Sequence, residues 1–201
     1  MTAFESLDHQ YVIKFFNPRE TVEKKWFSRF KKIAPLCSLK WIFNAYFKKT
    51  ERINSLMDFY QTGFNELKEE AALVYVHLSA STVLDKKLHV VDKSGTEREI
   101  DLKSSPFVLQ RKGDLVLGEL NRLLKEGKTE VLKKRFVQLY DLFSSRAQKG
   151  FSDPFQMLEK NYVFIEARAV QIDLGRMERD LGLNAEEEVQ KIFSRLETRY
   201  P

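Results

Sequence analysis

The sequence is poor in the residues that build disulfide frameworks and metal clusters. Among its 201 residues it has one cysteine, Cys37, and three histidines that lie far apart. A single cysteine excludes an internal disulfide, and no paired Cys/His spacing of the zinc-binding kind is present. We therefore expect a reducing compartment, the cytoplasm, although the same composition is compatible with an effector secreted without a conventional leader.

Long apolar runs are also missing. No stretch approaches the roughly 18 apolar residues that indicate a membrane-spanning helix, and the first residues lack the pattern of a signal peptide. With 43% hydrophobic residues, 16 of them phenylalanine, the chain has enough apolar side chains for a sizeable core. We expect a globular protein without a transmembrane segment.

Two short apolar segments near the carboxyl end, residues 160–164 and 169–174, predict a β-hairpin. It would place Asn161 beside Asp173, which are 12 residues apart. An amide oxygen and a carboxylate are ligands that suit a partly hydrated Mg²⁺ near nucleotide phosphates. A plain hairpin that ends in an Asp-capped turn is the alternative for the same residues.

The run Tyr11-Val12-Ile13-Lys14-Phe15-Phe16 is β-rich and contains a lysine. Together with Asn161 and Ile172-Asp173-Leu174-Gly175 it resembles the protein kinases. In kinases a strand lysine contacts the nucleotide phosphates, and an Asn and the Asp of Asp-Phe-Gly hold magnesium. The resemblance covers about residues 11–176, and the Lys-Phe-Phe strand and Ile-Asp-x-Gly-Arg ending are similar to an uncharacterised group of bacterial kinase-like proteins. It implies ATP and Mg²⁺ as cofactors, Lys14 as a catalytic and cofactor-binding residue, and Asn161 and Asp173 as metal ligands.

The resemblance implies three further roles. A glutamate on a helix predicted at about residues 54–79 would orient Lys14, and we favour Glu70 over Glu66. Residues 107–110 resemble the last sheet strand before a hinge, which places Gln110 at the nucleotide. Asp153 is the candidate catalytic base.

Two departures from the family bear on activity. The first glycine is Gly63, so no glycine-rich loop precedes Lys14. The family has its base five residues before the metal-binding Asn, where this chain has Gln156, whereas Asp153 lies eight residues before Asn161. Asp153 would serve as a base only with an insertion in the loop, and it otherwise starts a turn before Pro154.

The rest of the chain predicts an α+β fold in the kinase order. Residues 88–102 predict a hairpin with a Gly-containing turn, Asp114 and Thr129 are candidate caps of helices ending at Gly127 and Gly150, and Asn184 caps a last helix. Residues 1–112 would form an antiparallel-sheet lobe with a helical insertion at about 18–52. Residues 113–201 would form a reduced, mostly helical lobe with the metal-loop hairpin at 161–175.

The positive charge is concentrated in one segment. Residues 19–52 contain ten Lys or Arg and three Glu, a net charge of +7, against +5 for the whole chain. The same segment holds Trp26, Trp41 and several Phe and Tyr. This mixture suits an anionic membrane surface or a protein partner, with RNA less favoured. Core aromatics under a solvated basic face are the alternative.

Two functions follow. The first is a divergent phosphotransferase dependent on Mg-ATP, which the coexistence of Lys14, Asn161 and Asp173 favours. The second is a non-catalytic, pseudokinase-type binding module that contacts an anionic partner through the basic aromatic segment 19–52. The lack of a glycine-rich loop before Lys14 favours the second function.

Overall fold

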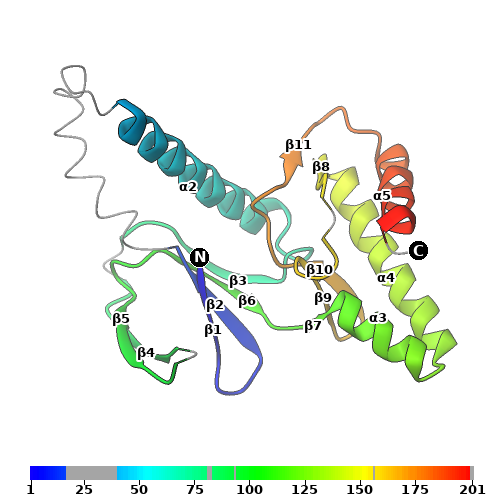
Figure 1. Cartoon of the computed structure of the whole chain (residues 1–201), viewed down its shortest axis with the longest axis horizontal. Coiled ribbons are helices and arrows are strands. Elements are labelled where there is room, and N and C mark those ends of the chain that lie inside the picture. Colours follow the sequence, from blue (N-terminus) through cyan, green and yellow to red (C-terminus); the bar gives the residue numbers. More distant parts are fainter. Residues whose placement is uncertain (17–39, 81–82, 93, 156, 200–201) are drawn as a thin grey trace.

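A computed structural model describes residues 1–16, 40–80, 83–92, 94–155 and 157–199, and for residues 40–52 it describes the backbone alone. This part of the chain has an α+β fold with small antiparallel sheets and four helices (Figure 1). The α+β class predicted from the sequence is confirmed. None of the described helices has the length and apolar character needed to cross a membrane.

The largest sheet has four antiparallel strands in the order β1-β2-β6-β3. These are β1 (Thr2–Glu5), β2 (Tyr11–Phe15), β3 (Leu73–His77) and β6 (Phe107–Arg111). Strands β2 and β6 are rich in Val, Ile and Phe, which suit a pleated, half-buried surface. Strand β6 pairs on both edges, and Lys14 of β2 lies opposite Val108. The predicted strands around Lys14 and at 107–110 are confirmed.

The long helix α2 (Lys40–Glu66) is shorter at its carboxyl end than the sequence predicted. The expected helix over 54–79 is wrong beyond Glu66. The chain turns at Ala72, which has a positive φ of 49°, and continues as strand β3. The side chains of Val74, Tyr75 and Val76 favour a strand, and pairing with β6 supplies partners for their backbone groups. The predicted insertion at 18–52 lies outside the described residues, except for the backbone of its last part in α2.

The two-stranded hairpin β4 (Lys87–Val91) and β5 (Glu97–Asp101) confirms the prediction for residues 88–102. Its turn has Gly95 at a φ of 81°. Asp92 Oδ1 accepts the amide protons of Ser94 and Thr96 at 2.9 and 3.1 Å. The turn is thus closed by the residue types that favour such conformations.

Helices α3 (Val116–Lys125) and α4 (Thr129–Gln148) follow, and their predicted ends are confirmed by the positive φ of Gly127 and Gly150. The cap predicted at Asp114 is wrong, because this residue belongs to the short strand β7 (Asp114–Leu115). Thr129 is likewise inside its helix, as the first residue after Lys128. The last helix, α5 (Ala185–Arg199), has the predicted cap: Asn184 Oδ1 accepts the amides of Glu186 and Glu187 at 3.1 and 3.3 Å.

A second sheet has the order β10-β9-β7, with β9 (Tyr162–Ile165) and β10 (Arg168–Gln171) joined by a tight turn. This confirms the predicted hairpin within 161–175. Strands β8 (Phe151–Ser152) and β11 (Glu178–Arg179) pair beside it. Figure 1 shows the hairpin between the large sheet with α2 and the helices α4 and α5.

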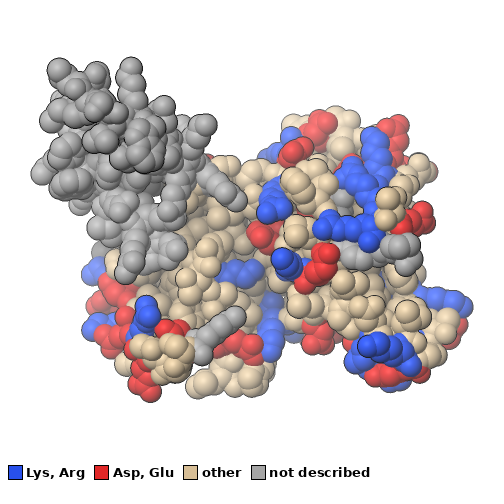
Figure 2. Space-filling model, viewed as in Figure 1, with Lys and Arg blue, Asp and Glu red and all other residues tan. Residues whose placement is uncertain are grey.

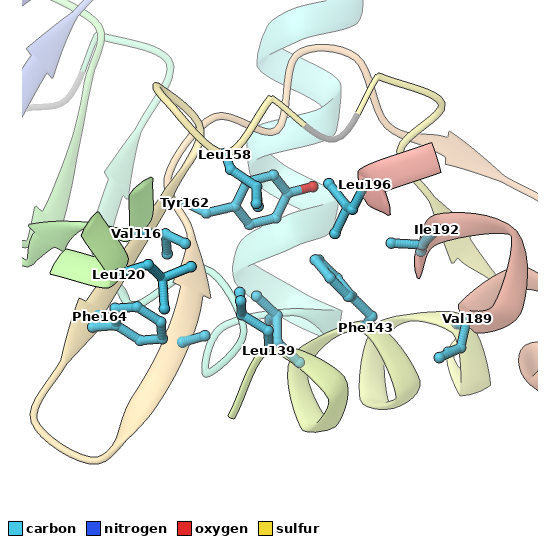
Figure 3. Close-up of a cluster of buried hydrophobic side chains, with 13 residues drawn as sticks. Val116, Leu120, Leu139, Phe143, Leu158, Tyr162, Phe164, Val189, Ile192 and Leu196 are labelled. Carbon is cyan, nitrogen blue, oxygen red and sulfur yellow. The ribbon is translucent and has the colours of Figure 1, made fainter. Parts of the chain in front are cut away.

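Two of the described hydrophobic clusters differ in where their residues come from. One cluster draws all its members from residues 116–196, and Figure 3 shows Tyr162 among them, with its hydroxyl as the polar atom of the group. The other joins Phe16 and Tyr60 from the first half of the chain to Leu174 and Met177 from the second. The two halves therefore share a core beside the sheet that carries Lys14.

Candidate functional site

Lys14 lies on β2 and reaches the segment that follows β10. Its Nζ donates a hydrogen bond to the carbonyl oxygen of Ile172 at 2.5 Å, across 158 residues of sequence. Burial lowers the pKa of Lys14 to about 8, against the opposing effect of the Asp173 charge, which raises it. The half-buried amine is thus partly desolvated and within electrostatic reach of the Asp173 carboxylate.

Asn161 and Asp173 lie at the open end of the β9–β10 hairpin. The Ile172 amide donates to the Asn161 carbonyl at 2.7 Å, which extends the pairing of Gln171 with Tyr162 by one step. Asp173 Oδ1 accepts the Gly175 amide at 3.0 Å, so the carboxylate is fixed in a tight turn. Lys14 and the backbone of Asn161 therefore both contact Ile172, the residue before Asp173.

Helix α2 packs against the turn that follows Asp173. Leu174 is almost fully buried, and a Cβ added at Gly63 of α2 would come within 2.3 Å of its Cδ1. The absence of a side chain at Gly63 lets the turn after Asp173 lie directly against the helix.

Tyr60 is a site residue that the sequence reasoning missed. It lies on α2, is 1% exposed, and packs edge-on against Phe16 at 5.6 Å between ring centroids. Burial and the Asp173 charge raise the pKa of its hydroxyl, and a hydrogen bond with the Leu174 backbone opposes them. In the sequence Tyr60 is one of several aromatics at helical spacing, so no local signal separates it from an ordinary core residue.

Glu70 does not orient Lys14. Its Oε1 accepts hydrogen bonds from Ser145 Oγ and Lys149 Nζ, both at 2.5 Å. Burial acts to raise the pKa of Glu70, but these bonds outweigh it and hold the pKa below its ordinary value. The reason is that α2 ends at Glu66, so Glu70 lies in the following turn and faces α4. Among the described residues, Lys14 has no ion pair with a glutamate.

Gln110 lies inside the sheet and not at its edge. Its side chain is 1% exposed, and its Nε2 donates to the carbonyl of Ala71 at 3.0 Å. Because β6 pairs on both sides, its amides and carbonyls are already used within the sheet. This placement does not agree with the nucleotide-binding role expected for Gln110. The connection between the two halves follows directly, at Lys112 and Gly113.

Asp153 is fully buried, at 0% exposure. Its Oδ2 accepts from Tyr162 Oη at 2.7 Å and Gln171 Nε2 at 3.1 Å, and its Oδ1 accepts the Phe155 amide at 3.0 Å. A base must reach the proton of a bound substrate. A carboxylate this enclosed and this fully hydrogen-bonded does not agree with the role of base expected from the sequence.

The donor set at the hairpin fits magnesium that arrives with a nucleotide. One carboxylate and one amide are too few for a cage made of protein alone, and Mg²⁺ sites commonly take one or two carboxylates, phosphates and water. Consistent with this, no three His, Cys, Asp or Glu side chains of the described residues gather into a metal cluster. The two surface hollows found along α4 and near Glu69 do not include Lys14, Asn161 or Asp173.

Charges of both signs are mixed on the face of the molecule shown in Figure 2. Many of these charges are paired, as in Arg179 with Glu66 at 2.8 Å. The side chains that carry the concentrated positive charge of segment 19–52 all lie outside the described part of the structure.

Comparison of the chain with protein-family models, with curated proteins and with solved structures gave no match. The assignment of the site therefore depends on its own geometry.

Proposed function

We propose that this chain is a divergent kinase-like protein that binds a nucleoside triphosphate with Mg²⁺. The observation that carries the proposal is the hydrogen bond from Lys14 Nζ to the carbonyl of Ile172, the residue before Asp173. Across 158 residues of sequence, the strand lysine thus reaches the residue before a post-strand Asp, and a strand lysine and such an Asp are the pair that kinases use to hold phosphates and metal.

The roles follow from residue chemistry. Lys14, when protonated, binds the phosphate oxygens, and Asn161 and Asp173 supply the two oxygen ligands for the metal. Magnesium, when bound, would neutralise the phosphate charge. Leu174 and Tyr60 hold the turn after Asp173 against α2.

The order of elements also supports the proposal. The lysine strand β2, helix α2, strands β3 and β6, helices α3 and α4 and the β9–β10 hairpin follow one another as they do in kinases. Under this proposal residues 1–112 correspond to a sheet-containing lobe and residues 113–201 to a reduced helical lobe. Gly113 lies at their junction.

Thermal unfolding with ATP tests the binding. ATP with Mg²⁺ is expected to raise the melting temperature by mass action, and Asp173→Ala should abolish the part that needs Mg²⁺. Asp180→Ala is the matched control, because Asp180 closes the same kind of turn through the Gly182 amide at 2.8 Å but lies outside the site. The proposal is wrong if millimolar ATP and Mg²⁺ leave the melting temperature of the parent unchanged.

A second candidate is a non-catalytic binding module on the same scaffold, without phosphoryl transfer. The observation that favours it is the enclosure of Asp153, which leaves the site without an accessible base at that position. The two candidates differ in release of the γ-phosphate: a phosphotransferase releases or transfers it in the presence of Mg²⁺, and a binding module does not.

The binding module would use the basic aromatic segment 19–52. Its affinity for anionic vesicles should fall steeply with added salt, because screening weakens contacts between exposed charges. Reversal of charge at Lys31 and Lys32 should lower this affinity and leave the melting temperature unchanged. Vesicle binding that is insensitive to both changes would contradict a role for the segment's charge.

A further inference from the structure

Arg146 is a charged side chain in the middle of the protein. It lies on α4 and is 0% exposed. Its Nη1 donates to Tyr162 Oη at 3.0 Å and to Gln171 Oε1 at 2.7 Å. A buried guanidinium is strongly unfavourable unless charge and hydrogen bonds compensate it, so its partners have to be found nearby.

Asp153 supplies the compensating charge through these same two partners. Tyr162 Oη accepts from Arg146 and donates to Asp153 Oδ2 at 2.7 Å. Gln171 accepts from Arg146 and donates through Nε2 to the same Oδ2 at 3.1 Å. Burial raises the pKa of Tyr162, which keeps its proton in place for Asp153. The four side chains form a closed ring of hydrogen bonds with one positive and one negative charge. Arg146 joins it through Nη1, and its Nε and Nη2 have no hydrogen-bond partner among the described residues.

The ring has one contact with the candidate site. The amide nitrogen of Gln171 carries two protons, and besides Asp153 it donates to the backbone carbonyl of Asp173 at 3.1 Å. Arg146 fixes the orientation of the Gln171 amide, because a flipped amide would bring its NH₂ against the guanidinium. The direction of the bond to Asp173 is therefore set by a charge on α4, a different element of the fold.

We propose that Arg146, Asp153, Tyr162 and Gln171 form a buried network that positions the backbone of Asp173, and with it the carboxylate that would bind the metal. These are positioning residues, since they act through Asp173. The part that concerns the metal rests on the proposed function. The part that concerns the backbone does not depend on any ligand.

Hydrogen exchange of the free protein tests the backbone part. In Gln171→Met, which keeps the length of the side chain but removes its polar atoms, amides of the segment 172–177 should exchange about tenfold faster, as expected for loss of one or two local hydrogen bonds. Tyr162→Phe removes one hydroxyl, keeps the Gln171 bond to Asp173 and should give a smaller increase. If Gln171→Met does not fold, the hydrogen exchange of Tyr162→Phe still tests the backbone part of the proposal.

Ile192→Ala is the control, because Ile192 is fully buried in the same hydrophobic cluster as Tyr162 but contributes no hydrogen bond. When its decrease in melting temperature equals that of a network variant, the control should leave the hydrogen exchange of residues 172–177 unchanged. Equal exchange in Ile192→Ala and the two network variants, or no increase in either network variant, would overturn the proposal.

Nucleotide binding tests the metal part. Gln171→Met should raise the Mg²⁺ concentration for half-maximal ATP binding about tenfold, again the effect of one hydrogen bond, without changing the affinity for ATP alone. If the parent binds no Mg-ATP but exchange increases as expected, the proposed function fails and the positioning network stands. An unchanged Mg²⁺ requirement in Gln171→Met would overturn the metal part.

Discussion

At the scale of single residues, the candidate site depends on what burial does to charge. Lys14 and Arg146 are both cations that the fold removes from water, but by different means. Arg146 is compensated by Asp153 through bridging side chains, whereas Lys14 has the carbonyl of Ile172 and the nearby charge of Asp173. Lys14 is only half-buried, whereas Arg146 is fully buried, and a partly accessible amine fits a residue that receives a phosphate ligand.

The lowered pKa of Lys14 predicts how stability changes with pH. The folded pKa is about 8 and the ordinary value 10.5, so between these values the unfolded chain binds more protons than the folded one. Stability from this group therefore rises with pH across the window and is lost as pH falls toward 8. We expect the free energy of unfolding of the parent, relative to Lys14→Met, to rise from pH 8 to pH 10 in denaturant titrations.

The difference between the two proteins is the informative quantity, because both contain the buried Tyr60 and Tyr162. Their raised pKa values lower stability above about pH 10, where unfolded tyrosines lose their protons first. A constant difference between pH 8 and pH 10 would contradict the desolvation of Lys14.

Arg146→Met should be among the most destabilising substitutions in the chain. It leaves Asp153 buried without its compensating charge, and breaking a buried pair on one side typically lowers stability by about 3 to 5 kcal/mol. Adding Asp153→Asn should recover part of the lost stability, since it removes the buried, unpaired carboxylate. Denaturant unfolding of the single and double variants measures the loss of stability in Arg146→Met and its recovery in the double variant. Strictly additive losses would show that the two charges are not coupled.

At the scale of elements, the position of the hairpin depends on close backbone approach. Gly113 follows β6, and a Cβ added there would lie 2.4 Å from the Phe164 carbonyl oxygen of β9. No side chain fits in this space. The connection between the two halves of the chain can therefore pair with the hairpin only because residue 113 is a glycine.

Gly113→Ala is expected to lower the free energy of unfolding by about 1 to 3 kcal/mol, the usual range for overpacking. Gly118→Ala is the matched control. Gly118 lies in α3 with open space around its Cα, and alanine is favoured over glycine in a helix by about 0.5 to 1 kcal/mol. Thermal or denaturant unfolding should therefore move in opposite directions for the two variants, and equal shifts would contradict the close approach.

At the scale of the whole molecule, contacts near the candidate site join the two halves. Leu174 and Met177 pack with Phe16 and Tyr60 in one cluster. Ion pairs also cross between the halves, as in Arg111 with Glu166 at 2.6 Å, although exposed pairs of this kind contribute little to stability. The shared cluster predicts that the described parts unfold together.

Leu174→Ala should lower the free energy of unfolding by about 2 to 5 kcal/mol, as for other buried leucines, while the transition stays single. Leu181→Ala is the control, because Leu181 is 82% exposed and surface changes usually stay within about 0.5 kcal/mol. Unfolding followed by circular dichroism and by tyrosine and tryptophan fluorescence should give coincident curves. Two separate transitions would show that the shared cluster does not couple the halves.

The sequence by itself determined the elements that depend on local pattern. The strand around Lys14, the hairpins at 88–102 and 161–175 and the cap at Asn184 were all readable, because side-chain alternation, turn residues and capping oxygens act over a few positions. The pairing of Asn161 with Ile172, next to Asp173, followed from the length of the hairpin. The end of α2 was not readable, since helical spacing continues past Glu66 and pairing of β3 with β6 overrides it.

Only the tertiary structure decided which polar groups are buried and with whom they pair. Glu70 lies with Lys149, Gln110 within the sheet, and Asp153 in the network of Arg146. Each of these residues is polar and lies at a plausible distance in sequence from the site, so spacing alone could not tell a catalytic role from a structural one. Burial and partner choice depend on contacts between segments that are not neighbours in the chain, and these contacts exist only in the folded protein.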